Sequence, residues 1–186
     1  MKKTIVFIRS LCIVIAICAV SIPVSSQSRS HGRSIYGELL GPSQGLGINY
    51  DARFKKESSE GFGWRTGAGV GYAYSSITAI YNIDGNYVDT YNQMFRLAIP
   101  IEVNYLLGKG RSKFESGAGG SMCVDLYRSA TGAKPKCAVG IIPYVNIGYR
   151  YVADKGFMFR IGVSSSYSFN GDRVVFCPYI GFGKEL

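Results

Sequence analysis

The segment from residue 62 to residue 75, FGWRTGAGVGYAYS, alternates between two kinds of side chain. Positions of one parity run from Phe62 through Val70 to Tyr74 and are mostly apolar or aromatic. The positions between them are mainly glycine, and Arg65 is the one charge among them. A period of two predicts a β-strand whose two faces meet different environments. Because the same alternation continues almost to the end of the chain, the sequence predicts an all-β fold.

Eight such segments are predicted, separated by turns such as GPSQ, KKESSEG, GKGRS, ADKG and the pair Asn170-Gly171. The connections after the third and fifth segments are longer, and this alternation of short and long connections is typical of up-and-down membrane barrels. We therefore predict one domain, an eight-stranded antiparallel transmembrane β-barrel over residues 35–186. The predicted strands are 35–40, 45–54, 62–75, 94–107, 113–124, 139–152, 157–169 and 176–186.

Aromatic residues on the apolar parity gather near the two ends of the predicted strands, with aliphatic residues such as Val70 and Ile99 between them. Two aromatic girdles around an aliphatic belt fit the two lipid–water interfaces of a bilayer, which favours an apolar face turned outward to lipid. The expected girdle residues are Phe54, Phe62, Trp64, Tyr72, Tyr74, Phe95, Tyr105, Phe114, Tyr149, Tyr151, Phe157, Phe159, Tyr167, Phe169, Phe176 and Phe182.

The opposite parity carries glycine, serine and a few charges, as expected for the narrow interior of an eight-stranded barrel. Charges enclosed there must pair or be hydrated, so we expect Arg–carboxylate pairs that plug the lumen. An ion or proton path through the same charges is the alternative. The predicted lumen network is Glu38, Asp51, Arg53, Arg65, Arg96, Glu102, Glu115, Arg150 and Arg160.

The first 26 residues have the layout of a secretory signal peptide, with Lys2 and Lys3 before an apolar run from Leu11 to Val20. Cleavage is expected near Ser26/Gln27, followed by a flexible lead-in over residues 27–34. Without Lys2, Lys3 and Arg9 the chain keeps 18 basic and 12 acidic residues, a formal net charge of +6. That charge suits anionic lipopolysaccharide, but the basic residues are too scattered to indicate nucleic-acid binding.

Three cysteines remain after the predicted leader, so at most one internal disulfide can form. Cys123 and Cys137 flank a candidate loop and are the expected pair in an oxidising compartment, although Cys177 is an alternative partner for either. Their spacings do not match a zinc site, and no metal or cofactor is expected.

The stretches YGELLGPSQGLGINYDARF and FRLAIPIEVNYLLGKGRSKFESGAGG resemble the opening strands and the central hairpin of a known family. It is the small outer-membrane β-barrel (porin-like) domain family of Gram-negative bacteria, with the OmpA/OmpX-type eight-stranded architecture. The resemblance covers residues 35–186 and implies location in the cell outer membrane and insertion by the barrel assembly machinery. The chain departs from such barrels at its end, where Leu186 replaces the usual aromatic residue.

No catalytic residues are expected, because the only histidine, His31, precedes the first predicted strand and leaves the barrel without a Ser–His or Cys–His dyad. We expect a non-enzymatic scaffold that presents loops 76–93, 125–138 and 170–175 for recognition or adhesion. A narrow porin-like channel is the main alternative, and a lipid-modifying outer-membrane enzyme is a third. The loop residues expected to make contacts are Tyr81, Tyr87, Tyr91, Tyr127 and Arg128.

Overall fold

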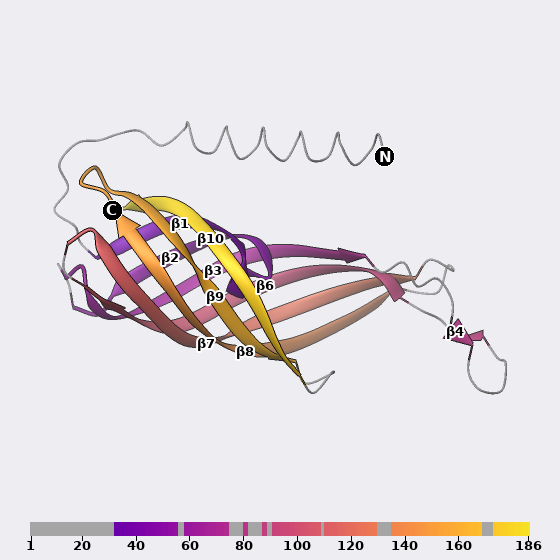
Figure 1. Ribbon diagram of the computed structural model, residues 1–186. Helices are drawn as coiled ribbons and strands as arrows, with labels where there is room; N and C mark the ends of the chain where they lie inside the picture. The colour runs from indigo at the N-terminus through magenta and orange to yellow at the C-terminus, as the bar shows by residue number, and fades with distance from the viewer. Residues whose placement is uncertain are drawn as a thin grey trace.

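Eight antiparallel strands close into a barrel in the order β1-β10-β9-β8-β7-β6-β3-β2, which confirms the predicted fold class (Figure 1). The structure is a computed structural model that describes residues 32–55, 58–74, 80–81, 87–88, 91–108, 110–129, 135–168 and 173–186. The barrel strands are β1 Arg33–Leu40, β2 Gly45–Arg53, β3 Gly61–Tyr74, β6 Tyr91–Leu107, β7 Ser112–Ser129, β8 Lys136–Val152, β9 Phe157–Ser168 and β10 Arg173–Glu185. Among the described residues, no helix is long and apolar enough to cross a membrane. The expected signal peptide lies outside these residues.

The connections divide the barrel into two ends. The turns around residues 54–60, 108–111 and 153–156 lie at one end together with the C-terminus, which we call the turn end. At the other, the loop end, β3 leads to β6, β7 to β8 and β9 to β10. Beyond the long strands, β4 (Ile80–Tyr81) and β5 (Tyr87–Val88) form a separate two-stranded pair in which Tyr81 lies opposite Tyr87 (Figure 1).

Several strands are longer than the alternation predicted. β7 continues to Ser129 and β8 begins at Lys136, and Asp125 to Tyr127 pair with residues 136–138, so most of the expected loop 125–138 is strand. The polar residues after Val124 end the apolar alternation without ending the hydrogen-bonded ladder, which does not depend on side-chain polarity. For the same reason Arg33 and Ser34 belong to β1 rather than to the expected lead-in.

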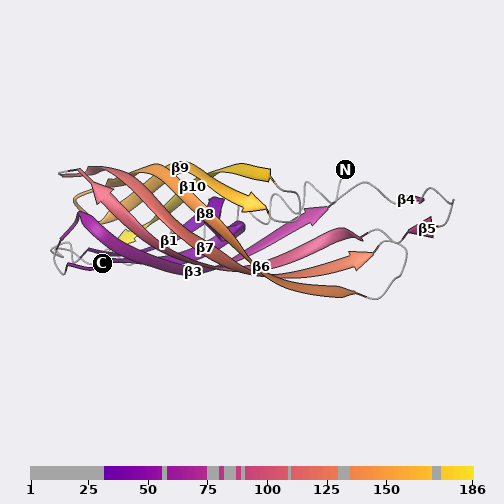
Figure 2. The ribbon, with the colours of Figure 1, turned by 90° about the horizontal axis from the view of Figure 1, so that it is seen from below.

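At the loop end, the strands of the barrel wall end at different heights. β9 pairs with β8 only from Tyr144 onward, so residues 136–143 of β8 have no partner on that side among the described strands. Four strand ends therefore extend past β9 and β10 (Figure 2). We call this part the projecting sheet: residues 71–74 of β3, 91–96 of β6, 125–129 of β7 and 136–143 of β8.

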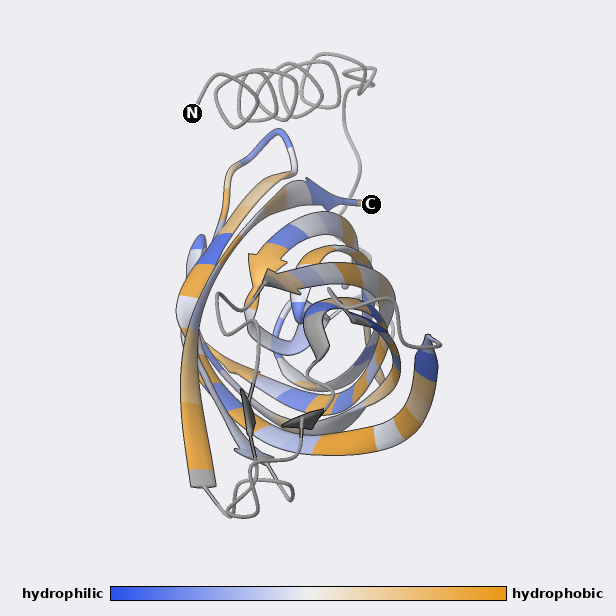
Figure 3. Ribbon diagram, turned by 90° about the vertical axis from the view of Figure 1, so that its right-hand side faces the viewer, coloured by the Kyte–Doolittle hydropathy of each residue, from blue (hydrophilic) through white to orange (hydrophobic). Residues whose placement is uncertain are grey.

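The barrel wall has an apolar outside and a polar inside. Viewed from the loop end, hydrophobic and hydrophilic residues alternate along the strands (Figure 3). Large apolar side chains such as Val70, Ile99 and Val145 are exposed on the outer surface, whereas most of the buried side chains are polar or charged and face the lumen. The best-buried part of the molecule is thus its charged interior, the reverse of a water-soluble protein.

The barrel interior as candidate functional site

Eight of the nine charges predicted for the lumen form one continuous, alternating series, which we call the charge chain. Its order is Arg53, Asp51, Arg150, Glu115, Arg160, Glu38, Arg65 and Glu102, and every internal member contacts an opposite charge on both sides. The N···O distances along it are, in order, 2.6, 3.1, 2.9, 2.7, 3.1, 3.2 and 3.0 Å. Four arginines and four carboxylates cancel in formal charge, as enclosed charges require.

The charge chain crosses the lumen and joins strands that are not neighbours in the sheet. Arg160 of β9 reaches Glu38 of β1 and Glu115 of β7, and its guanidinium carbon lies 4.7 Å from the ring centres of both Tyr36 and Tyr179. It also donates a hydrogen bond to the Tyr36 hydroxyl. With Tyr179 included, every strand of the barrel wall contributes a residue to this interior cluster.

Amide side chains extend the charge chain at both ends. Arg53 donates to the Asn104 side-chain oxygen at 2.5 Å, and Asn104 in turn donates to Asp51 at 2.6 Å. At the other end Asn146 donates to Glu102 at 2.7 Å. The other carboxylate oxygen of Glu102 and the Asn146 side-chain oxygen are buried with no hydrogen-bond partner among the described residues.

A turn between β1 and β2 lies inside the barrel. It comprises the 3-10 segment Gly41–Ser43 with Gln44, and we call it the inner turn; the sequence predicted only an ordinary connection there. Gly41, Pro42 and Ser43 are all buried. On the side of its own hairpin the Ser43 hydroxyl donates to Glu38 at 2.8 Å, and across the lumen the Pro42 carbonyl accepts from Ser121 at 2.7 Å.

Because Ser121 is on β7, four strands away from β1 in either direction around the barrel, the inner turn spans the lumen from wall to wall. Two glycines of β3 make room for it. A Cβ at Gly69 would collide with the Ser43 carbonyl oxygen, and one at Gly71 with that of Gln44. The glycines on the inward face of β3 are therefore needed because the inner turn packs directly against them.

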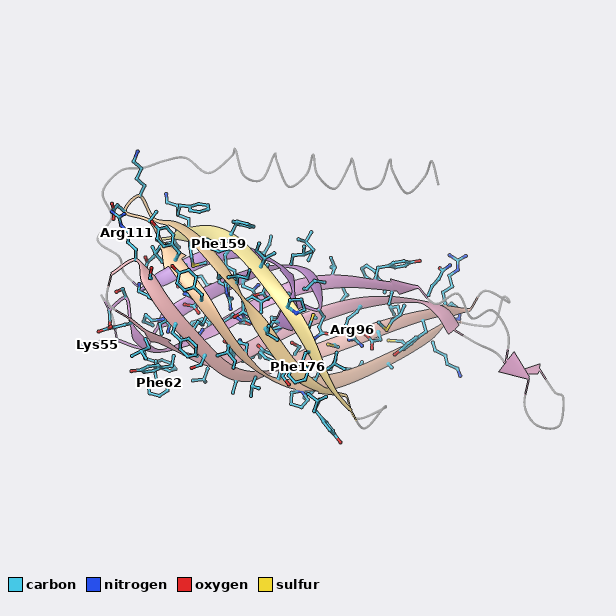
Figure 4. The ribbon with its side chains drawn as sticks, in the orientation of Figure 1. Lys55, Phe62, Arg96, Arg111, Phe159 and Phe176 are labelled. Carbon is cyan, nitrogen blue, oxygen red and sulfur yellow. The ribbon has the colours of Figure 1, made fainter. Side chains whose placement is uncertain are left out.

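The ninth predicted charge, Arg96, is not part of the charge chain and forms a separate Arg–carboxylate pair. Its guanidinium pairs with Asp125 in a two-pronged contact of 2.6 and 2.7 Å and donates to Gln44 at 3.1 Å. Arg96 lies on the loop-end half of the barrel, far from Arg111 at the turn end (Figure 4). The inner turn thus separates this pair from the charge chain, with Gln44 reaching toward Arg96 and Ser43 toward Glu38.

The structure places the expected girdle residues whose side chains it describes on the outer surface. Tyr105, Tyr151 and Phe159 are half-exposed. Tyr74 and Phe169 lie outside the residues whose side chains the structure describes. The remaining members are exposed: Phe54, Phe62, Trp64, Tyr72, Phe95, Phe114, Tyr149, Phe157, Tyr167, Phe176 and Phe182.

The expected disulfide between Cys123 and Cys137 is absent, and all three described cysteines are free. Cys137 lies three residues along the ladder from the position opposite Cys123, because Cys123 pairs with Gly140 and Leu126 pairs with Cys137. An odd offset places the two side chains on opposite faces of the sheet. Cys123 is accordingly buried in the lumen and Cys137 is exposed, while Cys177 faces the inner turn and accepts from the Gly41 amide at 3.4 Å.

The prediction omitted several interior residues. Asp125 fell in an expected loop, although its parity matches Glu115 and marks it as inward. The other omitted residues are Lys113, Tyr36, Tyr144 and Tyr179. Each is separated by an even number of residues from a charge-chain member or a buried glycine on its own strand, and this alternation identifies it as inward-facing. In the described part of the chain, no cluster of three or more His, Cys, Asp and Glu side chains is arranged to hold a metal ion.

Comparison with known proteins shows the fold. No protein-family model matches the chain, and no curated protein sequence matches it. Among solved structures, the chain is similar to the N-terminal β-barrel domain of Pseudomonas aeruginosa OprF, with a TM-score of 0.53 and 10% identity over 81% of this chain and 94% of that one. It is also similar to Neisserial surface protein A (NspA), with a TM-score of 0.54 and 13% identity over 83% and 94% of the two chains.

Proposed function

We propose that the protein is a non-enzymatic, integral outer-membrane barrel with a closed lumen that presents its loop end for recognition at the cell surface. The observation that carries the proposal is the contrast between the two faces of one sheet. The outside is an exposed apolar surface, and the inside holds the charge chain. Where its strands are paired on both sides, the barrel satisfies its backbone hydrogen bonds without water, as a wall in lipid must.

Two features support a closed lumen. Every charge of the charge chain is paired, so an ion that moved through it would have to displace a buried partner, which is costly. The inner turn adds a second obstruction, tied to opposite walls through Glu38 and Ser121. An eight-stranded barrel has an interior that side chains alone can fill.

The projecting sheet supports a role in recognition. It extends beyond β9 and β10, it bears the exposed Arg128 and the half-buried Tyr127, and β4 and β5 lie past its end. A rigid barrel that carries long hairpins is a common way to position contact residues.

Planar-bilayer recordings of the refolded protein test the closed lumen. We expect a heat-modifiable barrel that gives no steady openings. Steady sub-nanosiemens openings that change in the Arg65→Ala variant would contradict the proposal and favour the narrow channel.

Labelling of intact cells with a membrane-impermeant maleimide tests which end is presented. The three exported cysteines are first replaced by alanine, and Arg128→Cys is compared with Arg111→Cys at the turn end. We expect labelling of the first on intact cells and of the second only after permeabilisation. The opposite pattern would show that the loop end faces the periplasm.

A further inference from the structure

A pocket of about 620 Å³ lies on the outer surface at the turn end, and we call it the turn pocket. The turn from β2 to β3 and the neighbouring ends of β3 and β6 line it. Its principal side chains are those of Phe54, Lys55, Ser58, Glu60, Phe62 and Tyr105. Phe62 and Tyr105 lie opposite each other in the sheet, and their ring centres are 4.8 Å apart in an edge-to-face contact.

The turn pocket is apolar along the strands and charged beyond them. Phe54 and Phe62 are 60% and 62% exposed, and with Tyr105 they belong to the aromatic residues expected at a lipid–water interface. Lys55 and Glu60 lie in the turn, past the end of β2 and before the start of β3. Lys55 accordingly lies nearer the tip of the turn end than Phe62 does (Figure 4). These surfaces match an amphiphile whose tail follows the wall and whose headgroup reaches the turn.

The two charges of the turn pocket are held in one turn through Ser58. The Ser58 amide donates to the Lys55 carbonyl at 3.3 Å, and the Ser58 hydroxyl donates to the Glu60 carbonyl at 2.9 Å. Within the part of the chain that the structure describes, neither Lys55 nor Glu60 forms an ion pair. Arg111 and Asp154, in the other two turns of this end, pair with each other instead. The turn pocket therefore offers a ligand both a cation and an anion.

We propose that the turn pocket binds a zwitterionic phospholipid whose headgroup carries a primary ammonium, as phosphatidylethanolamine does. Lys55 pairs with the phosphate, Glu60 accepts hydrogen bonds from the ammonium, and an acyl chain packs on Phe62. The inference rests on the proposed membrane location and orientation, in which the turn end lies in the periplasmic, phospholipid leaflet. A purely anionic headgroup would leave Glu60 without a partner, and the quaternary ammonium of phosphatidylcholine has no N–H to donate.

Quenching of tryptophan fluorescence by brominated lipids tests the proposal, because bromine quenches a tryptophan that contacts the lipid chains. Trp64 is the only tryptophan, and it follows Phe62 by two residues on the same outer face of β3. The refolded protein is placed in phosphatidylcholine vesicles with increasing fractions of brominated phosphatidylethanolamine or, separately, brominated phosphatidylglycerol. The control is Phe159→Trp in a Trp64→Phe background, because β9 lies opposite β3 in the barrel.

At Trp64 we expect brominated phosphatidylethanolamine to be preferred over phosphatidylcholine by about twofold to fivefold, the range of exposed charge pairs. Lys55→Ala and Glu60→Gln should each remove most of this preference. Arg111→Ala, which changes another exposed charge of the turn end, should keep it. The Phe159→Trp control should show no preference, although brominated phosphatidylcholine should quench it as it quenches Trp64.

Four results would overturn the inference and leave the membrane location intact. They are no preference at Trp64, an equal preference at Phe159→Trp, a stronger preference for phosphatidylglycerol, and a preference that survives Lys55→Ala combined with Glu60→Gln. Loss of the preference in Arg111→Ala as well would count against the inference in the same way. Absence of quenching at both tryptophan positions in vesicles of brominated phosphatidylcholine alone would instead overturn the proposed membrane location.

Discussion

The charge chain and the Arg96–Asp125 pair are two sets of charges in one barrel, on opposite sides of the inner turn. The members of the charge chain are almost completely enclosed, and each internal member touches two opposite charges. The Arg96 and Asp125 side chains are 18% and 12% exposed and pair only with each other among the described charges. The same strands thus form a cross-linked half with enclosed charges and an open half with partly exposed ones.

The largest effect is expected from breaking the charge chain at its centre. Arg160→Met leaves Glu38 and Glu115 each without one partner in a buried site, and should lower the free energy of unfolding by about 3–5 kcal/mol. Urea unfolding of the protein from lipid vesicles measures this. The double variant Arg160→Met with Glu115→Gln should recover part of the loss, because one uncompensated charge is removed. A loss below about 1 kcal/mol, as for a surface pair, would show that water reaches the charge chain.

A matched pair of valines on β8 compares the outer surfaces of the two halves. Val145 is 54% exposed and lies opposite Ser165 of β9, whereas Val139 is 70% exposed and belongs to the projecting sheet. Val145→Arg should cost about 2–4 kcal/mol, as for a charge near the middle of the bilayer, and Val139→Arg about 0–1 kcal/mol. The same unfolding measurement applies. Equal costs would mean that the projecting sheet lies at the same depth as the closed wall.

The sequence predicts the cross-linked half better than the open half, for a physical reason. An apolar outer surface and a crowded lumen impose period two, so the strands and the parity of residues such as Glu115 and Arg160 can be read directly from the sequence. Past Val124 neither the apolar outer surface nor the crowded lumen constrains the side chains, so the alternation fades and the sequence predicts a β7 that is too short. The sequence therefore places Asp125, the partner of Arg96, in a loop and not in the lumen.

The alternation of side chains shows which residues face the lumen but not which of them pair across it. Parity places Arg160, Glu38 and Glu115 inside, but only the closure and stagger of the barrel bring β9, β1 and β7 within reach of one another. The inner turn illustrates the same limit. GPSQ reads as an exposed connection, and its burial depends on Gly69 and Gly71, which lie more than twenty residues further along the chain.

The smallest effect is expected from Arg96, and it sharpens the comparison with Arg160. Arg96→Met removes an Arg–carboxylate contact, as Arg160→Met does, but from a site that is partly open to water, so the loss should be about 1 kcal/mol or less. A double-mutant cycle with Asp125→Asn isolates the pair, and its coupling energy should fall as salt is raised, because charges that are partly open to water are screened more than enclosed ones. The Arg160–Glu115 cycle provides the control and should be nearly insensitive to salt. A large, salt-independent coupling at Arg96 would show that water does not reach this pair.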